Sequence, residues 1–429
     1  MISKNVLVIY TGGTVRLAHP QNAADVLCRS GSYQPYSNLL TAILRSQPRF
    51  DDPCADSIFS NLTNRQKYEL WKGDERREGE CRREQLTVHS TNQFHDSTPS
   101  GSDGSRFSAN LDALQTPPTF LSGVEHTVRY AILEYTPLLD SSDVGPEQWR
   151  RIASDIELNY DAFDGFVVLH GTDTMAYTAS ALSFMLEGLQ KSVLLTGSQI
   201  PLTHIRADAS DNILHSLLLA GTVTVPEVCI YFNHQLLRGN RSTKVSTSEF
   251  DAFRSYNCPP LARVGATFDV NWTVVRNNSK SDKDAAAQEH PLTVHKTLSP
   301  EICVLRVFPG MKLHVLDAIL ADLIKVRRSA LVLQTFGSGN IAHNEALLAS
   351  LKRAADAGVV IINTSQCHSG AVSAAYANGR ALAEAGVVSG KDLTCEAALT
   401  KLSYLLATNL PVGRIRELVP VSLRGEVSE

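Results

Sequence analysis

The chain has 429 residues, of which 43% are hydrophobic and 20% charged, as in an ordinary globular protein. This length predicts two domains, and the net charge of −4 argues against a nucleic-acid-binding protein. The first apolar run, residues 6–10, is too short for a signal-peptide core or a membrane span. The eight cysteines form no CxxC pair, so we expect a cytoplasmic protein with free thiols. Because of the net charge and the short apolar run, we expect no nucleic-acid partner and no membrane partner.

Short β-branched runs alternate with helical patterns over the first part of the chain. We expect strands at residues 6–10, 166–169, 193–195 and 228–232, and helices at residues 177–186 and 211–220. Continuous apolar strands that alternate with helices form a parallel sheet covered on both faces. The pattern therefore predicts an N-terminal α/β domain over residues 1–276.

One stretch of this domain, at about residues 51–116, has few apolar residues. Ten of the thirteen residues from 72 to 84 are charged, and residues 97–105 contain only Ser, Thr, Pro, Gly and Asp. Such a segment buries too little surface to offset the entropy of ordering it. We expect a disordered insertion that can be largely deleted.

A second series of strands and helices begins near residue 301. Strands are expected at residues 302–305, 330–333 and 359–362, with helices at 313–323 and 344–357 between them. This series predicts a C-terminal α/β domain over residues 301–429. Residues 277–300 begin with a polar stretch and are interpreted as the linker. The expected fold class is α/β, with two domains and mainly parallel, helix-covered sheets.

Three loops that follow expected strands are rich in glycine and hydroxyl residues. In an open α/β sheet, ligands bind outside the carboxyl ends of the strands. The loops are TGGT at residues 11–14, HGTDT at 170–174 and GSQ at 197–199. Each loop alone is better explained as a capped tight turn, and Lys244 alone as a solvated surface lysine. A threonine nucleophile does need a base, however, and a partly buried lysine can be one.

Together these blocks resemble the bacterial-type L-asparaginases, and nearly the whole chain takes part in the resemblance. The matching blocks are TGGTV at residues 11–15, HGTDTM at 170–175 and the GNRSTK setting of Lys244. Further blocks are similar to the type I cytosolic branch: EYTPLLDSSD at 134–143, MAYTASALSFML at 175–186 and FDAF at 250–253.

The resemblance implies an asparaginase/glutaminase-like fold and hydrolysis of L-asparagine to aspartate and ammonia, with no cofactor and no metal. Minor glutaminase activity and a homodimer or homotetramer are also expected. An ammonia-supplying subunit of a tRNA-linked amidotransferase and a catalytically silent asparagine sensor are lower-ranked alternatives.

The resemblance also implies roles for individual residues. The catalytic set is Thr11, Tyr33, Thr172, Asp173 and Lys244, with a threonine nucleophile and a covalent β-aspartyl intermediate. The substrate-binding set is Asp140, Ser141, Ser142, Thr172, Asp173 and Ser198. Whether Thr11 or Thr172 forms the covalent bond stays open, and we favour Thr11.

Some type I relatives bind a second asparagine at an allosteric site, whose matching residues here are Gln334, Ser365, Gln366 and Cys367. The family arginine that holds the effector carboxylate is replaced by Gln334. A glutamine offers a neutral donor where an arginine makes a charge-assisted pair. We therefore expect hyperbolic kinetics, or weak cooperativity at high substrate.

Overall fold

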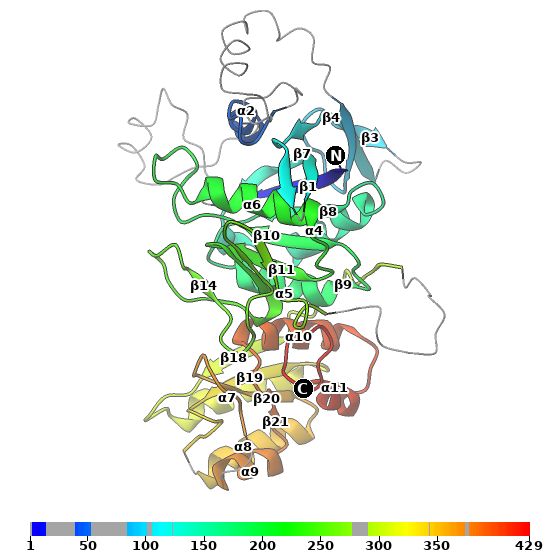
Figure 1. Ribbon diagram of the computed structural model, residues 1–429. Helices are drawn as coiled ribbons and strands as arrows, with labels where there is room; N and C mark the ends of the chain where they lie inside the picture. The colour runs from blue at the N-terminus through cyan, green and yellow to red at the C-terminus, as the bar shows by residue number, and fades with distance from the viewer. Residues whose placement is uncertain are drawn as a thin grey trace, which may run out of the picture.

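The computed structural model describes residues 2–13, 39–52, 84–100, 105–121, 123–276, 291–342, 344–373 and 377–429. They form two α/β domains, one above the other in Figure 1. Helix α5 (Met175–Met185) of the upper domain and α10 (Cys395–Ala407) of the lower one meet at the boundary. Tyr33 and residues 277–290 of the expected linker lie outside the described residues.

The N-terminal domain is built on one sheet whose centre is parallel, in the order β11-β10-β8-β1-β7. These strands are β1 (Ile2–Gly12), β7 (Val124–Leu139), β8 (Gly165–Leu169), β10 (Ser192–Thr196) and β11 (Val228–Phe232). Antiparallel strands extend both edges: β12 (Gln235–Arg238), β15 (Ala262–Val264) and β16 (Phe268–Val270) beyond β11, and β5 (Leu114–Gln115) and β6 (Thr119–Leu121) beside β7. Four expected strands are confirmed, whereas β7 was not predicted.

Helices cover both faces of this sheet, which explains why its central strands are continuously apolar. Helices α4 (Pro146–Asn159) and α5 pack on one face, and α2 (Leu39–Arg45) and α6 (Ala209–Thr222) on the other. All five residues of β8 are buried. Each large apolar side chain buried in this way contributes about 2 kcal/mol relative to an exposed one.

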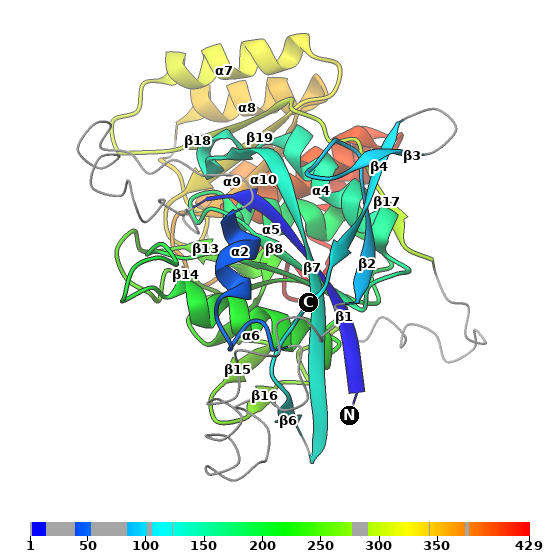
Figure 2. The same ribbon diagram turned by 90° about the horizontal axis from the view of Figure 1, so that it is seen from above.

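The long strand β7 determines where the loop after it lies. It runs parallel to β1 from the pair Ile2↔His126 to the pair Tyr10↔Glu134. The register then shifts, and Gly12 pairs with Leu139. Figure 2 shows the two strands side by side. Since Asp140 follows Leu139, this register brings the 140–142 loop next to the loop that follows β1.

The prediction of disorder is wrong for residues 84–100 and 105–116. They contain β2 (Gln85–Ser90), β3 (Thr98–Ser100) and β4 (Arg106–Asp112), which form a small antiparallel sheet. Val88 is buried in the same core as α4. The low apolar content of residues 51–116 did not indicate this sheet. Apolar residues alternate along β2 and β4, because only one face of the sheet needs to be apolar. Residues 53–83 and 101–104 lie outside the described residues.

The same segment also satisfies a buried carboxylate, so deleting all of it would do more than shorten a loop. Asp155 of α4 accepts hydrogen bonds from Ser90 Oγ at 3.1 Å, Thr91 N at 2.8 Å and Thr91 Oγ1 at 3.0 Å. Burial raises the pKa of Asp155, and the hydrogen bonds from Thr91 oppose that rise. A buried carboxylate stripped of such donors is strongly destabilising. The expectation that most of residues 51–116 can be deleted is therefore withdrawn for the part that holds β2 and β4.

The C-terminal domain has a four-stranded parallel sheet in the order β18-β19-β20-β21. The strands are β18 (Ile302–Arg306), β19 (Ala330–Thr335), β20 (Val360–Ser365) and β21 (Val388–Ser389). Helices α7 (Leu313–Lys325), α8 (Glu345–Asp356) and α9 (Ala377–Glu384) lie on one face, and α10 and α11 (Val412–Leu418) on the other. The predicted strands and helices of this domain are confirmed to within a few residues.

Part of the expected linker pairs with the two residues that follow α5. Strand β17 (Thr293–Val294) is antiparallel to β9 (Leu186–Glu187). In the described part of the chain, no helix has the length and apolar character needed to cross a membrane.

Candidate active site

Loops from three parallel strands meet at one edge of the N-terminal sheet. A Cβ atom on Gly13 would lie 2.2 Å from Gly171 N, and one on Gly171 would lie 2.7 Å from Ser141 Oγ. Gly13 also has a φ of +88°, which side chains rarely adopt. The glycines of the TGGT and HGTDT loops thus allow the loops after β1, β7 and β8 to touch. This is the edge of an α/β sheet, outside the carboxyl ends of the strands, where ligands bind.

Lys244 reaches into this edge from β13 (Thr243–Lys244), where it pairs with Phe253 of β14 (Phe253–Arg254). Its Nζ donates to Thr172 Oγ1 at 2.8 Å and to Asp173 Oδ1 at 2.6 Å. The lysine side chain is 16% exposed, whereas that of Asp173 is 66% exposed. A shielded lysine in contact with a threonine hydroxyl and an accessible carboxylate is an arrangement in which the lysine can serve as a general base.

Gln199 is a contact of this group that the sequence prediction missed. Thr172 Oγ1 lies 3.5 Å from Gln199 Oε1, and Gln199 Nε2 donates to Glu249 O at 3.0 Å. The sequence did place Gln199 near a ligand site, since it lies in the third glycine-rich loop, GSQ at residues 197–199. Because Lys244 donates to Thr172 Oγ1, the hydroxyl hydrogen of Thr172 is left to point toward Gln199.

Thr11 lies in the buried end of β1, the strand next to the one that Thr172 follows. It is 3% exposed, and its Oγ1 donates to Leu169 O of β8 at 3.0 Å. Tyr33, the proposed partner of Thr11, lies outside the described residues. The structure therefore brings Thr172, Asp173 and Lys244 into direct contact, and brings Thr11 to the same sheet edge.

The proposed substrate-binding loop is a short 3-10 turn, η2 (Ser141–Asp143), capped by Asp140. Asp140 Oδ1 accepts from Ser142 N at 3.1 Å and from Ser142 Oγ at 3.0 Å. Ser141 O accepts from Thr174 Oγ1 at 2.6 Å, which ties the loop to the start of α5. Ser198 is fully buried, and among the described residues its Oγ has no hydrogen-bond partner.

His170 is a second residue that the prediction missed, and it supports the loop that carries Thr172. The imidazole is fully buried and lies 2.7 Å through Nδ1 from Gly171 O. A carbonyl only accepts, so Nδ1 carries the proton and Nε2 accepts from Thr178 Oγ1 at 3.0 Å. Thr178 Oγ1 in turn accepts from Trp149 Nε1 at 2.9 Å. Burial lowers the pKa of His170 to about 4.

This buried imidazole predicts a pH dependence of stability. Between pH 6.5 and about 4 the unfolded chain binds a proton at His170 that the folded chain does not bind. The free energy of unfolding should therefore fall as the pH drops through this window, by about 3 kcal/mol from this group. His170→Gln should flatten the dependence by that amount in urea unfolding at pH 7, 5.5 and 4. His314→Gln, at an exposed position, is the control. Equal slopes for wild type and His170→Gln would contradict the prediction.

The residues proposed for regulation line a separate cavity of about 240 Å³ between the domains. Gln366 Nε2 donates to Gln334 O at 2.9 Å, and Ser365 Oγ accepts from Cys367 N at 2.9 Å. Arg306, which pairs with Gln334 across β18 and β19, also lines the cavity. Thr243 does so as well, and it directly precedes Lys244.

Comparison with protein families agrees with this geometry. The family model described as "Asparaginase, N-terminal" matches residues 5–276, and the model described as "Glutaminase/Asparaginase C-terminal domain" matches residues 301–419. The chain therefore belongs to the asparaginase family, in its bacterial type I branch.

Individual relatives are similar over most of the chain. L-asparaginase 1 of Escherichia coli (strain K12) is 46% identical over 300 residues, which cover 70% of this chain and 85% of the relative. The 60 kDa lysophospholipase of Mus musculus is 44% identical over 318 residues, 74% of this chain and 54% of the relative. The crystal structure of L-asparaginase I from Vibrio cholerae is 34% identical, with a TM-score of 0.70 over 99% of both chains.

Proposed function

We propose that this enzyme hydrolyses the side-chain amide of L-asparagine to L-aspartate and ammonia, with minor activity on L-glutamine. The observation that carries the proposal is the contact of Lys244 Nζ with both Thr172 Oγ1 and Asp173 Oδ1, at the edge where the Thr11 loop also ends. A hydroxyl nucleophile, a lysine base and a carboxylate are the groups that amide hydrolysis through an ester requires.

In the proposed reaction the Thr11 hydroxyl attacks the side-chain carbonyl carbon of asparagine. The hydroxyl proton is passed by Tyr33 to the amide nitrogen, so that the C–N bond breaks, ammonia leaves, and a β-aspartyl ester remains on Thr11. Lys244 Nζ then takes a proton from water, directly or through Thr172. The hydroxide attacks the ester, and aspartate leaves as that proton returns to Thr11 Oγ1. Backbone N–H groups of the Thr11 and Thr172 loops are candidate oxyanion donors, each worth about 3 kcal/mol of barrier.

The remaining site residues are proposed to hold the α-amino and α-carboxylate groups of the substrate. Asp140 and Asp173 supply the carboxylates for the ammonium. Ser141 and Ser142 supply hydroxyl and backbone donors for the carboxylate. Ser198 lies in the loop whose backbone carbonyl is proposed to contact the substrate amide. The hydrogen bonds from Ser142 N to Asp140 and from Thr174 Oγ1 to Ser141 O support this role, because they fix the loop before substrate arrives.

Ammonia release from the purified protein tests the proposal. Asparagine, glutamine and no substrate are compared under identical conditions. Rapid release from asparagine is expected, with a smaller rate from glutamine. Release from glutamine alone would favour the amidotransferase subunit, and binding of asparagine without release would favour a sensor.

We further propose that substrate does not regulate the enzyme strongly through the Gln334 cavity. Velocity against asparagine concentration should be hyperbolic, or weakly cooperative only at high substrate, because the side chain at 334 gives an effector carboxylate no charge-assisted pair. A sigmoidal curve that Ser365→Val abolishes would contradict this. If Arg306→Gln abolished it as well, the guanidinium on the neighbouring strand would be the group that replaces the family arginine.

A cytoplasmic location and a homodimer or homotetramer complete the proposal. The cysteines in the described part of the chain, Cys229, Cys258, Cys303, Cys367 and Cys395, are unpaired, as a reducing compartment favours. Light scattering coupled to size exclusion measures the oligomeric state directly, and a monomeric mass at micromolar concentration would contradict the assembly.

A further inference from the structure

Lys244 belongs to a segment that is held from the other domain. The segment runs from Arg238 through the turn η3 (Gly239–Arg241) to Lys244, and its own strand β13 forms only two residue pairs with β14. Lys244 reaches the N-terminal loops, whereas the side chains of Arg238, Asn240 and Arg241 contact residues 424–428 of the C-terminal domain. We call residues 424–428 the strap.

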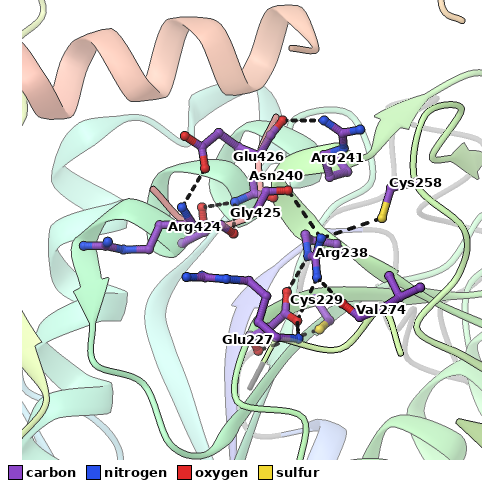
Figure 3. A network of polar contacts seen from close by, with 12 residues as sticks. Glu227, Cys229, Arg238, Asn240, Arg241, Cys258, Val274, Arg424, Gly425 and Glu426 are labelled. Carbon is purple, nitrogen blue, oxygen red and sulfur yellow. Dashed lines mark hydrogen bonds and ion pairs between the residues drawn. The ribbon is translucent and has the colours of Figure 1, made fainter. Parts of the chain in front are cut away.

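Three consecutive carbonyls of the strap accept hydrogen bonds from the segment, as Figure 3 shows. Asn240 Nδ2 donates to Arg424 O at 3.0 Å, and Arg241 Nη1 donates to Glu426 O at 2.8 Å. Arg238 Nη1 donates to Gly425 O at 3.4 Å. Arg238 and Arg241 are less than a tenth exposed, so these contacts are shielded from water.

Arg238 is held from two sides, which gives it a single orientation. Its Nε and Nη2 donate to the Glu227 carboxylate at 2.5 and 3.0 Å, and Nη2 donates to Val274 O at 2.8 Å. A planar guanidinium bound in this bidentate way is fixed in direction as well as position. The strap approaches it closely at Gly425, where φ is +78° and an added Cβ would lie 3.0 Å from Arg238 Cζ.

The strap is itself anchored by a buried ion pair. Glu426 and Lys401 of α10 lie 2.6 Å apart, with side chains 0% and 1% exposed. The Glu426 carboxylate also accepts from Leu423 N at 3.0 Å and from Arg424 N at 2.6 Å. Burial by itself would raise the pKa of Glu426, but Lys401 and these N–H groups hold it below its ordinary value.

A second anchor lies two residues further along the strap, at Ser428. Asp392 accepts from Ser428 N at 2.9 Å and from Ser428 Oγ at 2.6 Å. The same carboxylate accepts from Arg241 Nη2 at 2.7 Å, so it joins the strap and the segment directly. Thr243 Oγ1 donates to Glu396 Oε1 of α10 at 2.6 Å, immediately before the lysine.

We infer that the strap is a positioning element for catalysis: residues 424–428, anchored by Glu426 and Ser428, hold the 238–244 segment so that Lys244 Nζ stays within reach of Thr172 and Asp173. The inference rests on the proposed role of Lys244. A base must lie within hydrogen-bond reach of the group it serves, and a displacement of about 1 Å can reduce a rate about 100-fold. The C-terminal domain would then act on the chemistry without touching the substrate.

Glu426→Gln tests the inference. The amide keeps the size of the side chain and an oxygen for the backbone N–H groups, but removes the charge opposite Lys401. We expect kcat for asparagine to fall at least 10-fold, with KM changed less than threefold, because the strap does not contact the proposed substrate-binding loop. The pH profile of kcat should also shift, since Lys244 would lose its fixed distance to Asp173. Glu417→Gln makes the same change in an exposed pair with Arg414 and should leave every parameter unchanged.

The outcomes separate a positioning role from a structural one. A lower melting temperature, with kcat per folded molecule and the pH profile of kcat unchanged, would overturn the inference. If Glu426→Gln does not fold, Ser428→Ala decides, because it removes only the hydroxyl contacts to Arg241 and Asp392. A drop in kcat of about twofold or more without loss of stability supports the inference, and an unchanged kcat overturns it. If Lys244→Met stays active, the proposed role of Lys244 as the base fails first. If it is inactive while the strap variants are normal, only the inference fails.

Discussion

Lys244→Met is expected to abolish asparagine hydrolysis, with a loss of at least 1,000-fold in kcat, while the protein stays folded. General acid–base groups contribute about 100- to 10,000-fold, and groups that act as one unit fail together. Methionine keeps the aliphatic stem against the neighbouring side chains and removes the ammonium. The ion pair with Asp173 adds little stability, because that carboxylate is mostly exposed. The melting temperature should therefore be unchanged or slightly higher.

Steady-state ammonia release and a thermal melt measure the two halves of this prediction. Lys325→Met is the matched control, since Lys325 lies in an exposed pair with Asp322 on α7. It should keep full activity. A large drop in stability of Lys244→Met, with normal activity in the folded fraction, would make Lys244 a structural lysine.

Thr11→Ala and Thr172→Ala are each expected to reduce turnover by several orders of magnitude without unfolding the protein. Each change removes one hydroxyl and one methyl group from a loop after a buried strand. For Thr11 the lost hydrogen bond to Leu169 O is worth about 1 kcal/mol. Thr222→Ala is the control, because Thr222 Oγ1 also donates to a backbone carbonyl, that of Leu218, away from the site. Near-normal turnover in either variant would refute the role of that threonine.

The same pair of variants decides which threonine forms the ester. The double variant should be no slower than the slower single variant, because both residues serve one reaction. Mass spectrometry after rapid acid quenching should show an added β-aspartyl group on the peptide that contains Thr11. Its appearance on the peptide that contains Thr172 would reverse the assignment.

The central strands and the chemistry-bearing loops could be predicted from the sequence because both depend on short-range patterns. Continuous apolar runs such as that of β8 indicate burial on both faces, and glycine-rich loops after them indicate a ligand edge. The β7 strand was missed because charged residues, such as Glu125, Arg129 and Glu134, interrupt its apolar run. The β2–β4 sheet was missed because one-sided burial needs only alternating apolar residues.

The supports of the site were harder to predict, since they depend on contacts between distant parts of the chain. His170 and Gln199 lie inside recognised loops, but nothing in the sequence says that one meets Thr178 and the other Thr172. The ion pair of Lys401 with Glu426 is also invisible in the sequence, where both residues look like ordinary surface charges. Contacts between residues distant in the sequence determine the roles of these side chains, and the periodicity of the sequence does not predict such contacts.

Helix α5 has a consequence for how the chain folds as it is made. Ten of its eleven residues are buried, and Phe184 stacks on Tyr404 of α10, with ring centroids 6.0 Å apart. Because synthesis proceeds from the N-terminus, α5 leaves the ribosome well before α10. The face of α5 that packs against α10 therefore has no partner until the intervening residues have been made. During that interval the part of α5 that α10 later covers is exposed to solvent. Docking of α10 would end that exposure, so the second domain completes the folding of the first.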